Sequence, residues 1–320
     1  MNDSPMSTAE LTLAVDIGGT KIAAALVDPA GRILDRRGAR TPAESGAAAV
    51  LDCALDLGRE ITAGHRIDVV GIGSAGVIDP CTGTVTHATD ALPGWPGTPL
   101  AKAFAHAFAV PARALNDVHA HALGEARYGA GRGHRSMLLV AVGTGIGGAQ
   151  VMNGSVLFGE HFVAGHIGHL AAPEAQGIRC SCGRDGHLEG LASGPGILAA
   201  FRRAGGEAED TRAVVALASR STAQTEDPSA ALAARTLDIC GRATGRVIGG
   251  LANILDPAVI ILTGGVADIG ETWWRSVREG MAVEAMDAVA DTPLLPASAG
   301  QDAALLGAAV FAQDRLSGVG

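Results

Sequence analysis

The sequence has few aromatic residues, little basic charge and no long apolar run, and each shortage excludes a class of protein. Aromatic residues make up 3% of its 320 residues, and 24 Lys and Arg stand against 33 Asp and Glu, a formal net charge of −9. So acidic a chain has no electrostatic reason to bind nucleic acid. Apolar stretches such as residues 137–148, MLLVAVGTGIGG, are interrupted by glycine before they reach membrane-spanning length, and the N-terminal segment lacks the basic and apolar regions of a signal peptide. These features predict a cytoplasmic protein that binds neither nucleic acid nor a membrane.

Cysteine is also scarce, and its placement is uneven. The chain has five cysteines, an odd number that does not form a disulfide framework in a reducing compartment. Cys53, Cys81 and Cys240 are scattered and are most simply small buried apolar residues. Cys180 and Cys182 are different, because they lie one residue apart in CSCGRDGHLE, next to a histidine and a glutamate.

Glycine and small apolar residues are abundant. The chain has 45 glycines and is 48% hydrophobic, which is ample for a core at a length that suggests two lobes. Four apolar runs read as strands that end in glycines: residues 11–17, 67–74, 137–142 and 257–263. Helical patterns mark residues 41–64, 116–128, 195–250 and 302–316. This alternation predicts an α/β protein with a ligand at the carboxyl ends of the strands, and the similarity of VDIGGT to VGTGIGG suggests a duplicated core.

The first glycine turn lies in AVDIGGTKIA. Gly18 and Gly19 let backbone N–H groups approach an anion, while Thr20 and Lys21 offer a hydroxyl and a positive charge to phosphate oxygens. Asp16, at the end of the strand, can hold a magnesium ion through water. The turn is not a Walker loop, because GxxxxGK[ST] is absent and the following residues read as a strand. Taken alone, GGTK fits an ordinary hairpin turn equally well.

A second turn of the same chemistry favours the phosphate interpretation. VGTGIGG places a threonine between glycines after a strand, and TGG at 263–265 ends a further strand. The residues concerned are Gly143, Thr144, Gly145, Gly264 and Gly265. Together with the first turn, they predict a site that holds a nucleoside triphosphate from two sides.

Five motifs together resemble the ROK family (repressors, open reading frames, kinases): DIGGTK, LND at a helix start, GTGIGG, AGHIGH and CSCGRDGHLE. The resemblance spans nearly the whole chain. It implies an actin-like ATPase fold, related to ribonuclease H, with two α/β lobes and a central cleft. It further implies ATP and magnesium as cosubstrates, a hexose or amino sugar as acceptor, and a homodimer. We expect an N-terminal lobe of residues 1–115 plus about 301–320, and a C-terminal lobe of residues 116–300.

CSCGRDGHLE predicts a structural zinc site. Two cysteines with a nearby histidine supply three of the four ligands that such a site needs. The resemblance implies the fourth, since in the family the second histidine of the AGHIGH element binds zinc with three cysteines. His187 stands where the last cysteine is usual, so the inferred ligands are His169, Cys180, Cys182 and His187. Four protein ligands leave no position for water. Without the histidines, CSC would be a pair of loop thiols with no partner.

LND contains the candidate catalytic base. In the family, the residue at the position of Asp117 accepts the proton from the C6 hydroxyl of the sugar, and Asn116 hydrogen-bonds a ring hydroxyl. Phosphoryl transfer needs an oriented hydroxyl and charge stabilisation, so a single carboxylate suffices as base. The alternative is that Asn116 or Asp117 merely caps the helix. Gly76 in GSAG is also counted among the sugar-binding residues, although the proline often found in that segment is absent.

His166, His169 and Glu189 are the other candidates for contacts to the sugar. Glucokinase-like members of the family usually have glutamate at the position of His166, whereas bacterial N-acetylmannosamine kinases have histidine. A neutral imidazole can donate one hydrogen bond and tolerate an acetamido group, so N-acetylmannosamine is the preferred acceptor and glucose the alternative. His169 can donate its second N–H to a sugar hydroxyl, and Glu189 can accept from two hydroxyls. ALPGW at 91–95 resembles the sugar-lining segment of the family, but its usual asparagine is absent or displaced to Asp90, and no role is assigned.

Two other functions are weaker alternatives. Some members of the family are repressors with an N-terminal helix-turn-helix domain, for which DIGGT, beginning at Asp16, leaves no room. A non-catalytic sugar-sensing regulator is the remote alternative, which the presence of both Asp16 and Asp117 disfavours. An oxidoreductase is weaker still, because no GxGxxG opens a helix after the first strand.

Overall fold

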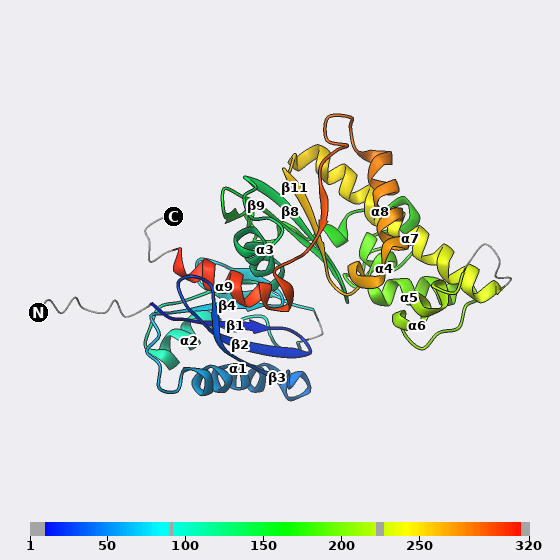
Figure 1. The fold of residues 1–320 in the computed structure, drawn as a ribbon. Helices are drawn as coiled ribbons and strands as arrows, with labels where there is room; N and C mark the ends of the chain where they lie inside the picture. Colours follow the sequence, from blue (N-terminus) through cyan, green and yellow to red (C-terminus); the bar gives the residue numbers. More distant parts are fainter. Residues whose placement is uncertain (1–9, 90–91, 222–226, 315–320) are drawn as a thin grey trace, which may run out of the picture. The chain divides into compact units, whose positions relative to one another are not determined.

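A computed structural model describes residues 10–89, 92–221 and 227–314 (Figure 1). The chain forms two compact units. The first comprises Met1–Gly133, Gly154–Ala164 and Ser298–Gly320, and the second comprises His134–Asn153 and Gly165–Ala297. The chain therefore passes from one unit to the other four times. None of the helices in the described ranges combines the length and the apolar composition needed to span a bilayer.

The sheet of the first unit is built around the strand that precedes the first glycine turn. Its order is β3–β2–β1–β4–β7, in which β1, β4 and β7 are parallel and the β1–β2 and β2–β3 pairs are antiparallel. The strands are β1 (Thr12–Ile17), β2 (Lys21–Val27), β3 (Ile33–Arg40), β4 (Val69–Ser74) and β7 (Ala112–Asn116), and a small hairpin of β5 (Val77–Asp79) and β6 (Thr84–His87) follows β4. The residues after GGT thus form a strand, as predicted.

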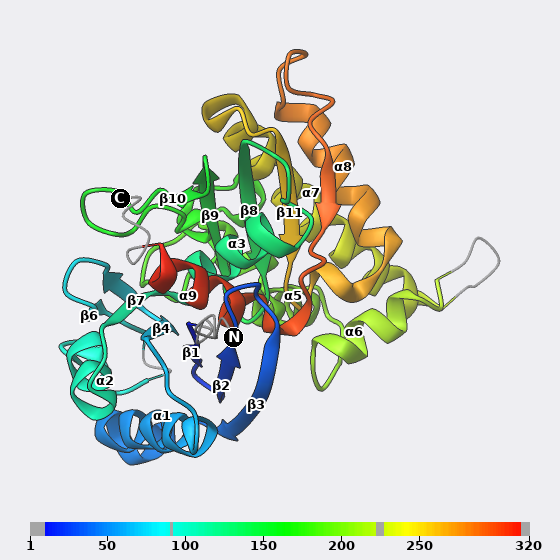
Figure 2. The ribbon, with the colours of Figure 1, turned by 60° about the vertical axis from the view of Figure 1, so that its left-hand side comes forward.

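Helices cover both faces of this sheet (Figures 1 and 2). Side chains of a strand alternate between faces. Leu13 and Val15 of β1 accordingly join the core under α1 (Gly46–Thr62) and α2 (Leu100–Phe108), whereas Ala14 faces α9 (Ala303–Gln313). The small residues of β1 and β2 on this second face let α9 lie close to the sheet.

Helix α3 (Asp117–Tyr128) packs backbone to backbone on α9. A Cβ on Gly307 of α9 would collide with the carbonyl oxygen of Ala120, and one on Gly124 of α3 would collide with that of Ala303. Only glycine fits at such contacts. This packing makes α3 part of the first unit, so the observed division differs from the boundary expected after residue 115.

The second unit repeats the plan of the first. Its sheet includes the order β9–β8–β11–β12, in which β9 is antiparallel to β8 while β11 and β12 run parallel. The strands are β8 (Ser136–Val142), β9 (Ile146–Met152), β11 (Val259–Thr263) and β12 (Leu294–Pro296). Each unit therefore has a central strand that pairs with a parallel strand on one side and with an antiparallel strand on the other. A glycine turn connects the central strand to the antiparallel one. The similarity of VDIGGT to VGTGIGG suggested this duplication.

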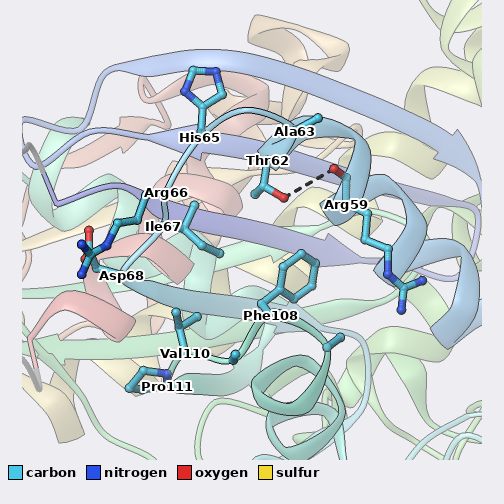
Figure 3. A pocket seen from close by; sticks show the side chains of 12 residues that line it. Arg59, Thr62, Ala63, His65, Arg66, Ile67, Asp68, Phe108, Val110 and Pro111 are labelled. Atoms are coloured by element: carbon cyan, nitrogen blue, oxygen red, sulfur yellow. Dashed lines mark hydrogen bonds and ion pairs between the residues drawn. The ribbon is translucent and has the colours of Figure 1, made fainter.

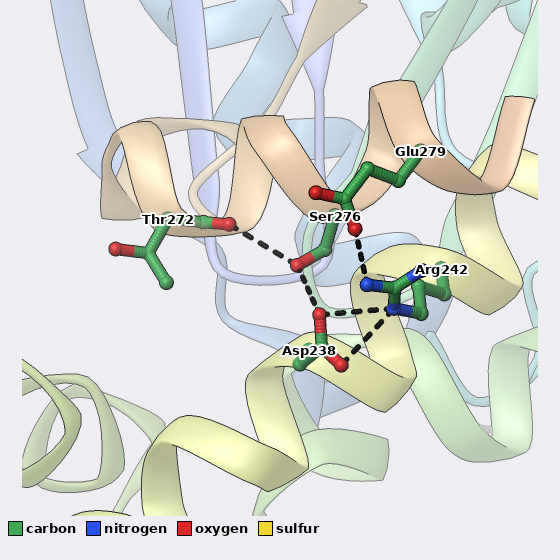
Figure 4. A network of polar contacts seen from close by, with 5 residues as sticks. All are labelled: Asp238, Arg242, Thr272, Ser276 and Glu279. Carbon is green, nitrogen blue, oxygen red and sulfur yellow. Dashed lines mark hydrogen bonds and ion pairs between the residues drawn. The ribbon is translucent and has the colours of Figure 1, made fainter. Parts of the chain in front are cut away.

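Helices of the second unit pack on this sheet and on one another. They are α4 (Leu188–Ala192), α5 (Gly194–Arg203), α6 (Thr211–Ala218), α7 (Pro228–Leu255) and α8 (Glu271–Glu284). A polar network joins α7 to α8: Ser276 Oγ donates to Asp238 Oδ1 at 2.7 Å, and Arg242 bridges Asp238 and Glu279 (Figure 4).

Short elements complete the described chain: β10 (Ser155–Val156), η1 (Ala43–Ser45), η2 (Ile167–His169), η3 (Pro173–Ala175), η4 (Ala267–Ile269) and η5 (Gly300–Asp302).

Candidate functional site

The first glycine turn, formed by Gly18, Gly19 and Thr20, connects β1 to β2. Gly18 N donates to Lys21 O at 3.0 Å and closes the hairpin. Thr41 holds the turn from outside, because its hydroxyl donates to Gly18 O at 2.7 Å and its N–H donates to Thr20 O at 3.1 Å. The side chains of Thr20 and Lys21 are exposed. The supporting role of Thr41 has no signal in the sequence, because it depends on the end of β3 returning to the turn.

Asn116 and Asp117 lie where β7 ends and α3 begins. Asn116 is the N-cap of α3, since its Oδ1 accepts from Val118 N at 2.9 Å and from His119 N at 3.2 Å. Its Nδ2 donates to Asp117 Oδ1 at 2.8 Å, and this oxygen also accepts from Val118 N at 2.9 Å. The capping alternative is therefore correct for Asn116. The side-chain amide of Asn116 also orients Asp117. The contact of Asn116 with a ring hydroxyl of the sugar stays a prediction.

Gly76 contacts Asn116, and Trp95 of the ALPGW segment lies in the core of the same unit. Gly76 O accepts from Asn116 Nδ2 at 2.9 Å, and the φ of +103° at Gly76 is one that glycine adopts without strain. Trp95 is fully buried and its Nε1 donates to Ser74 Oγ at 3.1 Å, so this residue of ALPGW belongs to the core. Asp90 lies outside the described residues.

Asp16 lies beside the start of α3. A Cβ placed on Gly73 of β4 would lie 3.6 Å from Asp16 Oδ1 and 3.8 Å from Asp117 Cα. Burial, and after it the negative charge of Asp117, raises the pKa of Asp16 to about 7, while Lys21 acts in the opposite direction. A carboxyl whose pKa is raised by burial and by a second carboxylate is typical of functional sites. The first unit thus brings Asp16 and Asp117 together at the carboxyl ends of β1 and β7.

The second glycine turn connects β8 to β9 in a similar way. Gly143 N donates to Gly145 O at 2.9 Å, and Thr144 is exposed between them. The loop after β11 lies against the base of this turn, because Gly264, with φ +93°, abuts the backbone of Val142 so closely that no Cβ would fit. The second unit therefore brings residues 143–145 and 264–265 together.

The four predicted zinc ligands converge in the second unit. One donor atom from each of His169, Cys180, Cys182 and His187 lies within 4.8 Å of the others. Cys180 Sγ is 3.5 Å from His169 Nδ1, and Cys182 Sγ is 3.2 Å from His187 Nδ1. With metal–ligand distances of about 2.0–2.3 Å, the donors of a tetrahedral zinc ion stand about 3.3–3.8 Å apart. The geometry and the chemistry of these four residues fit such an ion.

The local environment of the donors also suits a metal ion. Burial lowers the pKa of His169, which favours the neutral imidazole that coordinates metal. A hydrogen bond from the Arg184 backbone N–H lowers the pKa of the Cys182 thiol, whereas burial raises the pKa of Cys180. A divalent cation would stabilise both thiolates.

Zinc content tests the ligand set. We expect the purified protein to retain about one zinc ion per chain, because four ligands close the site. Cys182→Ser should lose most of the metal, and Cys81→Ser, which changes an exposed cysteine of the first unit, should keep it. Elemental analysis after gel filtration in a weak chelator measures the difference. Equal zinc content in both variants, or none in the unsubstituted protein, would contradict the assignment.

Glu189 links the zinc loop to the second glycine turn. Its Oε2 accepts from Ile146 N at 2.9 Å, and a Cβ on Gly145 would lie 2.9 Å from the same oxygen. Its Oε1 accepts from the hydroxyl of Ser181, the residue between the two cysteines. Each carboxylate oxygen can accept more than one hydrogen bond, so contacts to sugar hydroxyls stay compatible with this arrangement. Ser181 and Ile146 carry no sequence signal, because their connection exists only in three dimensions.

His166 stands next to the zinc cluster. Its exposed ring stacks on that of the ligand His169, with centroids 6.1 Å apart and an interplanar angle of 26°. Coordination of His169 to zinc would therefore hold its imidazole against His166, the residue that the sequence assigns to sugar discrimination.

A separate hollow of about 660 Å³ lies elsewhere in the first unit (Figure 3). It is lined by the residues that precede β4 and β7, at the amino ends of these parallel strands. Ligands of such sheets bind at the carboxyl ends. The side chains of Arg59, His65 and Arg66 also point in different directions, and Arg66 lies beside Asp68, 3.9 Å from Nε to Oδ1.

Comparison with known proteins gives one consistent match. The profile of the ROK family matches residues 12–315. The chain is 33% identical to a glucokinase of Halalkalibacterium halodurans, covering 92% of both chains, and 36% identical to an N-acetylmannosamine kinase of Escherichia coli, covering 94% of this chain and 98% of the relative. The crystal structure of a ROK family glucokinase from Streptomyces griseus, in complex with glucose and AMPPNP, has a TM-score of 0.78 at 31% identity and covers 95% of this chain and 99% of that one. The chain therefore has the actin-like ATPase fold and belongs to the ROK family.

Proposed function

We propose that this protein is a sugar kinase that transfers the γ-phosphoryl group of ATP to the C6 hydroxyl of a hexose or an N-acetylhexosamine. The observation that carries the proposal is the oriented carboxylate of Asp117 at the start of α3, held by Asn116 and placed beside Asp16. The named kinase activities of the similar proteins, and the AMPPNP and glucose bound to one of them, support the same class of reaction.

Asp117 is the proposed general base. As the C6 oxygen forms its bond to the γ-phosphorus and the bond from that phosphorus to the ADP oxygen breaks, the hydroxyl proton passes to the carboxylate. The hydrogen bonds from Asn116 Nδ2 and Val118 N fix Asp117 Oδ1, which sets the direction of the side chain. The protein otherwise contributes position and electrostatics, as phosphoryl transfer requires.

Asp16 is the residue that would hold magnesium. Burial and the charge of Asp117 raise its pKa more than the charge of Lys21 lowers it, and a cation at this point would stabilise the ionised carboxylate further. Bound magnesium neutralises charge on the phosphates during transfer. The exposed Thr20 and Thr144, each in a glycine turn, would donate hydroxyl and backbone N–H groups to phosphate oxygens.

N-acetylmannosamine is the proposed acceptor, with glucose as the second candidate. The exposed imidazole of His166 supports the first, because it can donate one hydrogen bond beside an acetamido group without demanding two hydroxyls. The similar glucokinases support the second. Both sugars present a C6 hydroxyl to the same base, so the choice rests on the residues around C1 and C2.

Exchange of His166 for glutamate tests this choice. We expect His166→Glu to raise the ratio of kcat/KM for glucose to that for N-acetylmannosamine by about tenfold or more, since each misplaced polar contact costs about 1–3 kcal/mol. His134→Glu makes the same change at another exposed histidine and should leave the ratio unchanged. An unchanged ratio in both variants would remove His166 from the discrimination of sugars.

The activity itself is tested with magnesium-ATP and a panel of sugars. Glucose, mannose, N-acetylglucosamine and N-acetylmannosamine are each incubated with the protein, and ADP release is followed by a coupled assay. We expect the fastest release with N-acetylmannosamine. Release no faster than without sugar in all four cases would contradict both acceptors, and failure to bind ATP would exclude the kinase class.

A further inference from the structure

Glu125 is a fully buried carboxylate in α3 that sequence reasoning did not single out. It is 0% exposed, its hydrogen bonds in the described chain come from backbone N–H groups, and the imidazole Nε2 of His121 lies 4.0 Å from Oε1. Oε2 accepts from Ala130 N at 2.9 Å, Oε1 accepts from Ala299 N at 2.8 Å, and Ser298 N lies 3.1 Å from both oxygens. A buried charge is tolerated only when such donors compensate for its lost hydration.

The donors belong to two segments that connect the units. The chain passes between units after residues 133, 153, 164 and 297. Ser298 and Ala299 follow the last of these points directly, and Ala130 lies shortly before the first. Another residue of α3, the buried His119, donates from Nε2 to Ala164 O at 2.9 Å, just before the third point. Helix α3 thus forms hydrogen bonds to chain segments next to three of the four points at which the chain passes between the units.

The same helix begins with the proposed base. Glu125 lies eight residues after Asp117, or about 12 Å along the helix at about 1.5 Å per residue. The glycine contacts with α9 prevent α3 from shifting independently, and only the short η5 separates α9 from the segment that Glu125 binds. The position of the connecting segments and the position of Asp117 are therefore fixed by one rigid element.

We propose that Glu125 is a positioning residue for the phosphoryl transfer: by fixing the connecting segments at Ala130 and at Ser298–Ala299 to α3, it keeps Asp117 in place during turnover. This inference rests on the proposed function of Asp117. A displacement of about 1 Å at a reacting group costs about 100-fold in rate. Weaker hydrogen bonds at Glu125 are therefore expected to lower the rate by letting Asp117, at the other end of α3, shift.

Two substitutions weaken the hydrogen bonds between Glu125 and the connecting segments in different ways. Glu125→Gln replaces one acceptor by an NH2 group that faces N–H donors. Gly129→Ala leaves Glu125 unchanged but introduces a Cβ that would collide with Glu125 Oε2 and lie 2.9 Å from Ala299 N. Hydrogen exchange of the substrate-free protein should be at least 10-fold faster at the amides of Ser298 and Ala299 in both variants. The kcat should fall at least 10-fold while the KM for ATP stays unchanged.

Asp28→Asn is the matched control. Asp28 is a buried carboxylate of the same unit that accepts from Ala30 N and Arg32 N in a local turn, so its loss should affect exchange only there and leave kcat unchanged.

The sharpest readout combines Glu125→Gln with Asp117→Asn. A residue that acts through Asp117 causes no further loss of rate once that carboxylate is absent. An equal loss in both backgrounds, or unchanged exchange at Ser298 and Ala299 in both single variants, would overturn the proposal. If the unsubstituted protein phosphorylates no sugar, the function proposed for Asp117 fails, and the exchange experiment still decides whether Glu125 anchors the segments.

Discussion

Replacing Asp117 by asparagine is expected to lower kcat by about 1000-fold, within the range of about 10²–10⁴ that general bases contribute. Asparagine keeps the size of the side chain and can still accept from Val118 N, so the start of α3 should stay intact. ATP binds through the glycine turns and not through this residue in our proposal. Its dissociation constant, measured by calorimetry without sugar, should therefore change by less than about threefold, which corresponds to about 0.7 kcal/mol.

A helix cap of the second unit serves as the control for Asp117. Asp210 is the N-cap of α6 and accepts from Ala213 N at 2.8 Å. Asp210→Asn should cost only the capping contribution, of about 1 kcal/mol or less, and leave turnover near normal. Near-normal turnover in Asp117→Asn would leave Asp117 only its hydrogen bonds at the start of α3 and remove it from the mechanism.

Asp16 should make the ligand-free protein less stable as the pH rises. Its pKa in the folded chain is about 7, compared with 3.8 for the unperturbed group, so between these values the folded state holds a proton that the unfolded state has released. The associated stability is fully present below about pH 4 and is lost as the pH rises through 7, a total on the order of 4 kcal/mol. Asp16→Asn removes this dependence, and the variant should be more stable than the unsubstituted protein at pH 8 although it loses activity.

Urea unfolding at pH 5 and pH 8, without magnesium or nucleotide, measures this effect. The free energy of unfolding of Asp16→Asn relative to the unsubstituted protein should increase between the two pH values. Asp52→Asn, a change at an exposed position of α1, should follow the unsubstituted protein at both. Parallel behaviour of Asp16→Asn and Asp52→Asn would show that Asp16 is not held in a raised-pKa environment.

Local patterns sufficed to predict much of the fold. The strands ending at Ile17 and Val142 and the helix starting at Asp117 were predicted because hairpin turns, alternation and capping act over a few residues. The zinc ligands were predicted from the spacing of Cys180 and Cys182 and from the resemblance, and the structure brings all four donors together.

What the sequence did not reveal depends on contacts between distant segments. Glu125 reads as an ordinary charge on a helix until Ser298 and Ala299 are seen to donate to it. The roles of Ser181 and Thr41 likewise appear only where a loop or strand returns to a glycine turn. The division of the chain was misjudged for α3 for a similar reason, because the glycines that bind it to α9 carry no pattern that marks a helix contact.

The phosphorylated carbon of the product tests the central claim most directly. After incubation with magnesium-ATP and N-acetylmannosamine, and separately with glucose, carbon and phosphorus NMR locates the new phosphate ester. We predict a 6-phosphate in a one-to-one ratio with ADP. A phosphate on the anomeric oxygen, or ADP without any phosphorylated sugar, would contradict the assignment of Asp117 as the base for a C6 hydroxyl.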